Sequence, residues 1–469
     1  MKRRFWKVLL VLLLLVLGGA VWSAHWFVGR ETTPAALVRR LEKALNCRAE
    51  LESASVSLFS FPAKLELKGL RLLPRDGEVD KPLKDRKPPK KVETVLAVPG
   101  LSADLSLLGL LRHEIKVGQL TLTGAEAYTI RRKNGKNTLS EMFSKPPADV
   151  PTEPKPEPPP ETKPETPSKA SKPFAAALVL AKLEKAKITI RNEKRKQLIE
   201  LQDVNVSLGN VRYTPAAAAA LNAAPLEAMP SDLKASLRLT STDLKDERRQ
   251  MDFTLDLAST VNLLANGELA DGTTLNINVR TASWIDRIPT LEKLARKMAK
   301  LKDQIGLDLT AFPVSGRLAS GTSIRARIEG GLFRFVEDTD FHFDTCLIKI
   351  KAGSWFNPDD QQHEFEGLIS ANGEITKGAM SGVDAFLSSK GESLAKIGRG
   401  TLMKTLLNGE GLLTIPFTST EDIGRPEVTI SKSFEKSISN AVGDAAKALL
   451  QDALDGGDGL QNLIDGLRK

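Results

Sequence analysis

Two motifs of the type Ser-x-x-Lys contain residues that could catalyse a reaction: Ser393–Lys396 and Ser433–Lys436. A serine nucleophile followed three residues later by a lysine is typical of penicillin-recognising enzymes. Those enzymes also carry Ser-Asp-Asn and Lys-Thr-Gly motifs, and this sequence contains neither. A four-residue pattern alone arises often by chance. We therefore expect no catalytic residues in this chain and predict that it is not an enzyme.

The carboxylates and histidines do not predict a metal site. The acidic pair Asp359 and Asp360 follows Asn357-Pro358, which is typical of a turn. No further series of oxygen ligands follows this pair, as a Ca²⁺ loop would require. The sequence has no glycine-rich phosphate loop, and no two of its histidines lie at metal-ligand spacing: His25, His113, His342 and His363. We expect no metal and no cofactor.

The N-terminal segment Met1–Val28 predicts a membrane anchor. An apolar run from Val8 to Val28, interrupted only by Ser23 and His25, follows a basic flank. As a helix this run is about 31 Å long, enough to cross the hydrocarbon core of a bilayer. Because basic flanks stay in the cytoplasm, we expect a single-pass membrane protein with a cytoplasmic N-terminus and a body exported across the membrane. A cleaved signal peptide is the alternative, since the small residues 18–20 offer a cleavage site.

The formal net charge of +9 is concentrated beside this predicted anchor. Residues 1–50 carry nine basic and three acidic side chains, which leaves only +3 for residues 51–469. Basic residues at a membrane end suit anionic headgroups, whereas a nearly neutral remainder is not typical of a nucleic-acid-binding protein. We expect no nucleic-acid partner. The two cysteines, Cys47 and Cys346, leave open whether they form a disulfide.

A short amphipathic helix is predicted directly after the anchor. Thr33 is a good capping residue before Pro34, and Leu37, Leu41 and Leu45 recur at four-residue steps. The other face is expected to carry four charged residues: Arg39, Arg40, Glu42 and Lys43. Two compatible interpretations remain open. The helix closes the end of a β core, or it lies on the membrane surface, where Arg39 and Arg40 would contact phosphates.

Most of the remaining chain alternates apolar and polar residues with a period of two, which is typical of half-buried strands. After Gly118 the apolar positions change parity, as a β-bulge would cause. The polar stretch from Asp80 to Lys91 is expected to be a solvated loop. One helix is predicted near residues 290–305, where apolar residues recur at helical spacing.

Composition and pattern divide the chain into five segments. They are an anchor (1–30), an N-terminal β region with its leading helix (31–144), a linker (145–173), a β body (174–430) and C-terminal amphipathic helices (431–469). The linker contains eleven prolines among Glu, Lys and Thr. Such a composition forms no packed core and behaves as an extended spacer.

Several short motifs follow one another in a characteristic order after the anchor and near the end of the chain. They are Phe61-Pro62, Leu65–Leu70, Leu107–Leu111, Ile115–Val117, Leu120–Ala125, Ile130–Arg132, Gly135–Asn137, Gly411–Thr418 and Pro426–Ile430. Their order and spacing resemble the AsmA-like family, the inner-membrane-anchored periplasmic proteins of diderm bacteria, which include bridge-like lipid transport proteins. The resemblance covers residues 1–143 and 381–467.

Pattern and resemblance together predict a mainly β fold. We expect a single N-terminal transmembrane helix, then a long, curved, antiparallel-rich β-sheet with amphipathic helices at both ends. The resemblance implies that the sheet forms an open, taco-like groove whose apolar face holds acyl chains. Alternation along the strands gives the candidate groove residues: Leu120, Leu122, Leu237, Leu239, Phe253, Leu255, Ile277 and Val279. The pattern alone equally fits a closed core between two sheets.

The resemblance implies a function in the cell envelope. We expect the protein to bind phospholipid or transfer it between the inner and outer membranes, as part of outer-membrane biogenesis. The alternative is an anchored scaffold or assembly factor that contacts outer-membrane or other envelope proteins instead of lipid. A continuous apolar groove favours the first function, and a closed core with a large exposed patch elsewhere favours the second.

Overall fold

The structure is a computed structural model of the 469-residue chain. It describes residues 33–57, 62–79, 81, 83–88, 94–106, 114–133, 136–142, 144, 175–213, 229–263, 269–299, 306–307, 314–358, 360–389, 399–400, 402–440, 443 and 447. The predicted anchor Met1–Val28 and the predicted linker 145–173 lie outside these residues. Within the described ranges, no helix combines the length and the apolar character needed to span a membrane.

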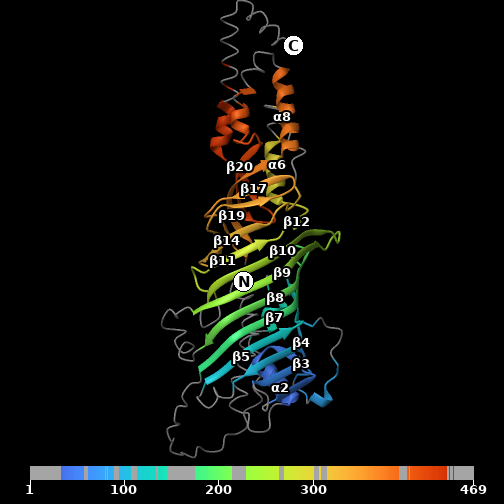
Figure 1. The fold of residues 1–469 in the computed structure, drawn as a ribbon. Helices are drawn as coiled ribbons and strands as arrows, with labels where there is room; N and C mark the ends of the chain where they lie inside the picture. The colour runs from blue at the N-terminus through green and yellow to red at the C-terminus, as the bar shows by residue number, and fades with distance from the viewer. Residues whose placement is uncertain are drawn as a thin grey trace, which may run out of the picture. The chain divides into compact units, whose positions relative to one another are not determined.

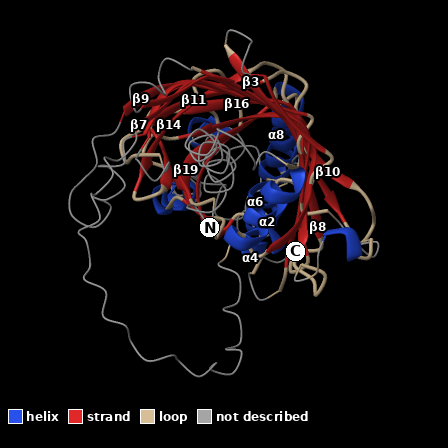
Figure 2. Cartoon of the chain, turned by 90° about the horizontal axis from the view of Figure 1, so that it is seen from below, coloured by secondary structure: helices blue, strands red, loops and turns tan. Residues whose placement is uncertain are grey.

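The described chain is mainly β, as the alternating pattern predicts (Figures 1 and 2). It divides into two compact units. The N-terminal unit comprises Lys2–Arg248 and Asp256–Thr273, and the C-terminal unit comprises Arg249–Leu255 and Thr274–Lys469. Strand β10 (Arg249–Leu263) contributes residues to both. The five segment boundaries expected from composition, and the curved groove, remain predictions.

The N-terminal unit contains two helices and nine complete strands among its described residues. They are α2 (Pro34–Ala44), β1 (Cys47–Glu50), β2 (Ser53–Ser57), β3 (Ala63–Pro74), a 3₁₀ turn (Leu83–Asp85), β4 (Leu96–Leu105), β5 (Glu114–Thr123), β6 (Glu126–Arg131), α4 (Thr138–Met142), β7 (Ala175–Asn192), β8 (Gln197–Tyr213) and β9 (Met229–Asp243). Helix α2 begins as predicted, because the Thr33 side chain accepts a hydrogen bond from the Ala36 amide and Pro34 lies in the first turn.

The sheet of this unit pairs its strands in the order β3, β4, β5, β7, β8 and β9. Strands β1 and β2 both pair with β3 on its other side. The pairings of β5 and β6 with β7 are parallel, and the other registers given for described residues are antiparallel. The long strands β7, β8 and β9 lie side by side in Figure 1.

The predicted change of parity at Gly118 is confirmed. Leu120 is opposite Ala103, and Val117 is opposite Leu105, so β5 holds one more residue than β4 between these pairs. Val117 and Leu120 are consequently both buried although they are three residues apart. A bulge of this kind bends the strand and changes the direction of its side chains.

The C-terminal unit contains the first part of β10, eleven further strands and several helices among its described residues. They are β11 (Thr274–Val279), β12 (Trp284–Ile285), α6 (Pro289–Met298), β13 (Gly316–Arg317), β14 (Thr322–Glu329), β15 (Leu332–Phe335), β16 (Thr339–His342), β17 (Cys346–Ile350), β18 (Trp355–Phe356), β19 (Gln362–Ala371), α8 (Gly373–Ser388), β20 (Thr414–Asp422) and β21 (Glu427–Ile430). Residues 402–406 and 432–440 are also helical.

This unit has a closed hydrophobic core. Leu291, Leu294 and Met298 of α6 join Val383 of α8 and Ile369 of β19 in a single buried cluster. The helix predicted near residues 290–305 is therefore present as α6. The sequence pattern does not predict α8, because its glycines lower helix propensity. Burial of Ala379, Val383 and Leu387 against the strands offsets that cost.

Candidate functional site

Apolar rows cross six adjacent strands on one face of the N-terminal sheet. One row consists of Leu65, Ala103, Leu120, Ala181, Leu208 and Leu233, each the direct partner of the next. The second row is two residues away from the first on every strand. It consists of Leu67, Leu101, Leu122, Leu183, Val206 and Ala235. Because side chains alternate between the faces of a sheet, both rows lie on the same face.

Burial varies along this face. The first row is buried throughout, whereas the second row is buried only at Leu101 and Leu122. Further along β7, β8 and β9 Ala186 and Val204 are buried, whereas the larger aliphatic side chains around them are partly exposed. We call these residues the apolar patch: Leu183, Ile188, Ile190, Ile199, Leu201, Val206, Leu237 and Leu239. Three of them, Ile188, Leu201 and Leu239, are successive partners in one row.

The apolar patch is large enough to accept a hydrocarbon chain. From Leu183 to Ile190 it extends for about 20 Å along β7. One leaflet of a bilayer contributes about 15 Å of hydrocarbon. Partly exposed aliphatic side chains on three adjacent strands lose contact with water when an apolar ligand covers them, which contributes about 25 cal/mol for each Å² removed from water.

The reverse face of the same strands is polar. Lys182, Ser207 and Lys234 form one row there. Thr189, Glu200 and Thr240 form another, and Lys187 makes an ion pair with Glu200 at 2.9 Å. The sheet is thus mainly apolar on one side and mainly polar on the other, as the alternation in the sequence predicts, although Thr240 is buried.

The structure places the predicted groove residues of the N-terminal unit in two environments. Leu237 and Leu239 belong to the apolar patch. Leu120 is fully buried and Leu122 nearly so, so neither offers surface to a ligand in this conformation. Their role as groove residues remains a prediction. The predicted groove residues did not include Ile188, Ile199 and Leu201, although these follow the same alternation of apolar and polar residues.

The other four predicted groove residues lie in the C-terminal unit. Phe253 and Leu255 are in β10 and are partly exposed. Ile277 of β11 is partly exposed and pairs with Ile324 of β14, whereas Val279 is buried opposite Thr322. The function of these four residues also remains a prediction.

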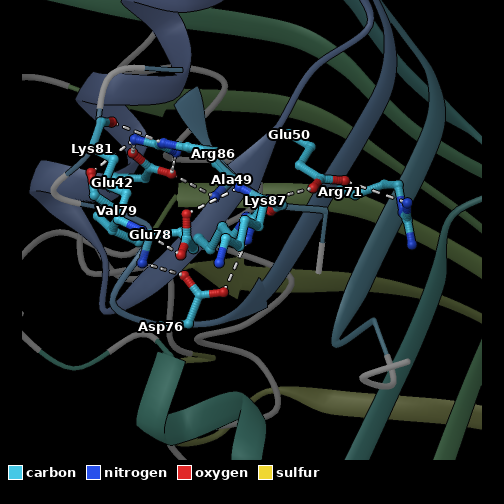
Figure 3. A network of polar contacts seen from close by, with 11 residues as sticks. Glu42, Ala49, Glu50, Arg71, Asp76, Glu78, Val79, Lys81, Arg86 and Lys87 are labelled. Carbon is cyan, nitrogen blue, oxygen red and sulfur yellow. Dashed lines mark hydrogen bonds and ion pairs between the residues drawn. The ribbon is translucent and has the colours of Figure 1, made fainter. Parts of the chain in front are cut away.

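Helix α2 differs from the prediction at one charged residue. Glu42 was expected on the hydrated face, and this expectation is wrong, because Glu42 is 4% exposed. Both its carboxylate oxygens accept hydrogen bonds from the guanidinium of Arg86, at 2.6 and 2.9 Å. The Ala49 amide donates to the same carboxylate at 3.0 Å (Figure 3). A buried carboxylate is tolerated here because it is paired and hydrogen-bonded.

The stretch that contains Arg86 is exposed at most of its described residues, as expected of a solvated loop, but Arg86 itself departs from this prediction. The Arg86 side chain is 5% exposed and donates to the backbone carbonyls of Lys81 and Val79. Glu78 accepts hydrogen bonds from the Lys81 ammonium and the Lys87 amide. These contacts hold the stretch together, and the Arg86–Glu42 pair attaches it to α2 (Figure 3).

The two predicted membrane-surface residues also lie on α2. Arg39 is exposed and Arg40 is partly buried. The exposed position of Arg39 leaves its guanidinium accessible, and contact of either side chain with a membrane remains a prediction.

The C-terminal unit holds a buried chain of polar side chains. The two ring nitrogens of His363 lie 2.7 Å from the Glu421 carbonyl oxygen and 2.7 Å from the Ser419 hydroxyl. Ser419 is fully buried and shares a hydrogen bond with Thr290 at 3.2 Å. Burial lowers the pKa of His363. A serine with no exposed surface cannot meet a substrate, so this chain joins α6 to β19 and β20 and holds the core together.

The structure describes one of the two Ser-x-x-Lys motifs and part of the acidic pair. Ser433 is exposed on the helix 432–440 and its hydroxyl bonds the Ser431 hydroxyl at 2.6 Å. Ser393–Lys396 lies outside the described residues. Asp360 accepts a hydrogen bond from the Gln362 amide, which confirms its role in a turn. Among the described residues, no group of His, Cys, Asp or Glu could hold a metal ion.

The comparison with protein families gives one match. Residues 4–319, more than half of the chain, match the AsmA family. No curated protein and no solved structure matches the chain.

Proposed function

The chain belongs to the AsmA family, and on this premise we propose that it binds phospholipid and transfers it between the inner and outer membranes. Membership of the family suggests a role in envelope or outer-membrane biogenesis. The specific proposal, a lipid ligand, depends on the apolar patch of β7, β8 and β9.

The apolar patch is the observation that carries the proposal. Aliphatic side chains on a sheet normally pack against a second layer, as they do in the buried row through Leu120. Those of the apolar patch keep part of their surface in water. Apolar surface left uncovered in this way indicates a binding site. A ligand without polar groups along its length fits it because it needs no hydrogen-bond partner there.

The proposed location follows from the N-terminal sequence. We propose a single-pass inner-membrane protein whose N-terminus is cytoplasmic and whose body is periplasmic, because the basic flank precedes the apolar run of Met1–Val28. The accessible Arg39 and the adjacent Arg40 would then face phosphates of the inner membrane. The buried Glu42–Arg86 pair would give the helix after the anchor a rigid attachment to the sheet.

The test uses the full chain, expressed in a diderm bacterium and purified in a mild detergent with extensive washing. Phospholipid that copurifies is quantified by mass spectrometry for the wild type, for the double variant Leu201→Asp/Leu239→Asp, and for Thr242→Asp. Thr242 is the matched control, because it is partly exposed in β9 like Leu239 but lies on the polar face. Lipid held around the anchor is the same in all three proteins.

The proposal predicts that the double variant loses the phospholipid that the wild type and the control retain. Equal phospholipid in all three proteins would overturn it. If the double variant instead loses a copurifying envelope protein while its phospholipid is unchanged, the scaffold function replaces lipid transfer. Circular dichroism of each variant establishes that the strands are intact.

A further inference from the structure

The polar face of β7, β8 and β9 contains a hollow on the side of the sheet opposite the apolar patch. Its cavity volume is about 430 Å³. It is lined by six residues of the polar rows, together with Leu183, Lys185, Val206 and Ala235 between them: Lys182, Glu184, Asn205, Ser207, Lys234 and Ser236. The hollow is open to solvent, so a small polar ligand has direct access to it.

Three of these residues form a single row across the strands. Lys182 is the direct partner of Ser207, and Ser207 is the direct partner of Lys234. The outer two strands are about 10 Å apart, a span that two lysine side chains can close from opposite sides. The row therefore presents one ammonium group on each side of a hydroxyl group.

Neither ammonium group is neutralised by the described part of the protein. Lys182 and Lys234 make no hydrogen bond or ion pair with any described residue, and Lys182 is nevertheless partly buried. The contrast with Lys187 is direct, since that lysine on the same face pairs with Glu200 at 2.9 Å. Glu184 also lines the hollow, but Lys185 beside it carries the opposite charge. The hollow is thus net positive.

Beside the hollow, the backbones of β7 and β8 both depart from regular strand geometry. Lys185 and Asp203 have positive φ angles of 53° and 50°, and the strand registers shift beside each of them. The Asn205 side chain holds both strands, because its oxygen accepts from the Lys185 amide at 3.0 Å and its amide donates to the Asp203 carbonyl at 2.8 Å. Such a conformation persists only where the surrounding structure enforces it, so the backbone beside the hollow is fixed before any ligand arrives.

We infer that this hollow binds a phosphate group through Lys182, Lys234 and the Ser207 hydroxyl. Two unpaired ammonium groups match the charge of a phosphate, and charge-assisted hydrogen bonds to its oxygens are the strong kind. The hydroxyl between them supplies a neutral donor. The phosphate belongs either to inorganic phosphate or to the headgroup of a phospholipid, and both present the same oxygens to the lysines. The lysine and serine side chains lie on the opposite face from most of the apolar patch, although Leu183 and Val206 of the patch also line the hollow. The inference does not depend on the proposed lipid-transfer function.

The test measures binding to the purified full chain in detergent. Equilibrium dialysis with radiolabelled inorganic phosphate compares the wild type with the Lys182→Ala/Lys234→Ala variant. Lys194→Ala is the control, because Lys194 is an exposed lysine in the turn between β7 and β8 and does not line the hollow. A fourth protein, Ser207→Asp, places a carboxylate between the two lysines and imitates the bound anion.

We expect saturable phosphate binding by the wild type and the control, and a loss of about tenfold or more in affinity in the double variant, as removal of two charge-assisted contacts implies. Phosphate should raise the melting temperature of the wild type. Ser207→Asp should melt higher than the wild type without phosphate and should not respond to it. Because this variant adds stability, it tests the site even if the double variant folds poorly.

A second arm distinguishes the two sources of the phosphate group. Dihexanoyl phosphatidylglycerol, which stays soluble as single molecules, competes with the labelled phosphate. Displacement shows that a lipid headgroup enters the hollow, and failure to displace, with phosphate still bound, identifies inorganic phosphate as the ligand. The inference is overturned if the folded wild type binds neither probe, or if it binds phosphate no better than the double variant does.

Discussion

The guanidinium of Arg86 donates to both carboxylate oxygens of Glu42, at 2.6 and 2.9 Å, although 44 residues separate the two in sequence. Both side chains are at most 5% exposed. Taking two charges out of water is costly, and the pair compensates only while both partners are present. The stretch around Arg86 is therefore attached to α2 by an interaction that tolerates no single replacement.

Replacing Arg86 by methionine should destabilise the N-terminal unit by about 3–5 kcal/mol, because it leaves a buried carboxylate without its counter-charge. Hydrogen exchange of the Ala49 amide, which donates to Glu42, measures the local opening. Arg71→Met is the control, since Arg71 is 45% exposed and pairs with Glu50 at 3.3 Å, an interaction worth at most about 1 kcal/mol. Equal effects of the two replacements would show that burial of the Glu42–Arg86 pair is unimportant.

The buried His363 should make the C-terminal unit less stable in mild acid. Burial lowers its pKa below the ordinary value of 6.5, so the folded state binds its proton less readily than the unfolded state. The stabilisation is complete above the unfolded pKa and is lost as the pH falls through it toward the folded pKa. The nearby Asp422 carboxylate and the Glu421 carbonyl oppose the shift without reversing it.

Melting curves of the full chain between neutral pH and about pH 5, a range that includes the ordinary pKa of histidine, test this fall of stability in acid. His363→Gln should melt lower at neutral pH and should show a weaker fall of melting temperature with acid. His342→Gln removes an exposed histidine and should leave the wild-type fall unchanged. An unaltered pH profile in His363→Gln would assign the dependence to other groups.

Both cysteines should be unreactive in the folded protein. Cys47 and Cys346 are free thiols with at most 3% exposure. Burial raises the pKa of Cys47 to about 12 and that of Cys346 to about 11, and the thiolate is the reactive form. Iodoacetamide at about pH 8, below the ordinary thiol pKa, should alkylate neither before unfolding and both afterwards, as mass spectrometry can measure. Rapid alkylation of the folded protein, or a disulfide between the two, would contradict this.

Gly367 of β19 should not tolerate a methyl group. A Cβ at this position would overlap the Lys349 carbonyl oxygen and lie closer to the Phe417 ring than ordinary van der Waals contact allows, so the backbone of β17 must move. Gly367→Ala should destabilise the C-terminal unit by about 1–3 kcal/mol. A Cβ added at Gly378 of α8 would have no atom within 4 Å beyond its own helix backbone and chain neighbours, and Gly378→Ala should stabilise the helix by about 0.5–1 kcal/mol. Urea denaturation distinguishes the two, and the same sign for both would contradict the packing described.

Local pattern predicts much of this fold, and distant partners account for most of what it misses. Alternation predicts the strands and even the change of parity at Gly118, because each depends on neighbouring residues alone. The buried position of Glu42 is not predictable in this way, since its partner Arg86 lies in a polar stretch that reads as solvated. The apolar patch was predicted only at Leu237 and Leu239, because alternation identifies an apolar face without indicating where a second layer covers it.

The proposal of a lipid-binding face is tested most directly by photo-crosslinking in living cells. A photoreactive amino acid replaces Leu201, on the apolar patch, or the adjacent Gln202, on the polar face of the same strand, in the full chain. Our account predicts that irradiation attaches phospholipid at position 201 and not at position 202, as mass spectrometry of the purified adduct would show. Phospholipid at neither position, or equally at both, would contradict it, and a protein adduct at position 201 would indicate a scaffold instead.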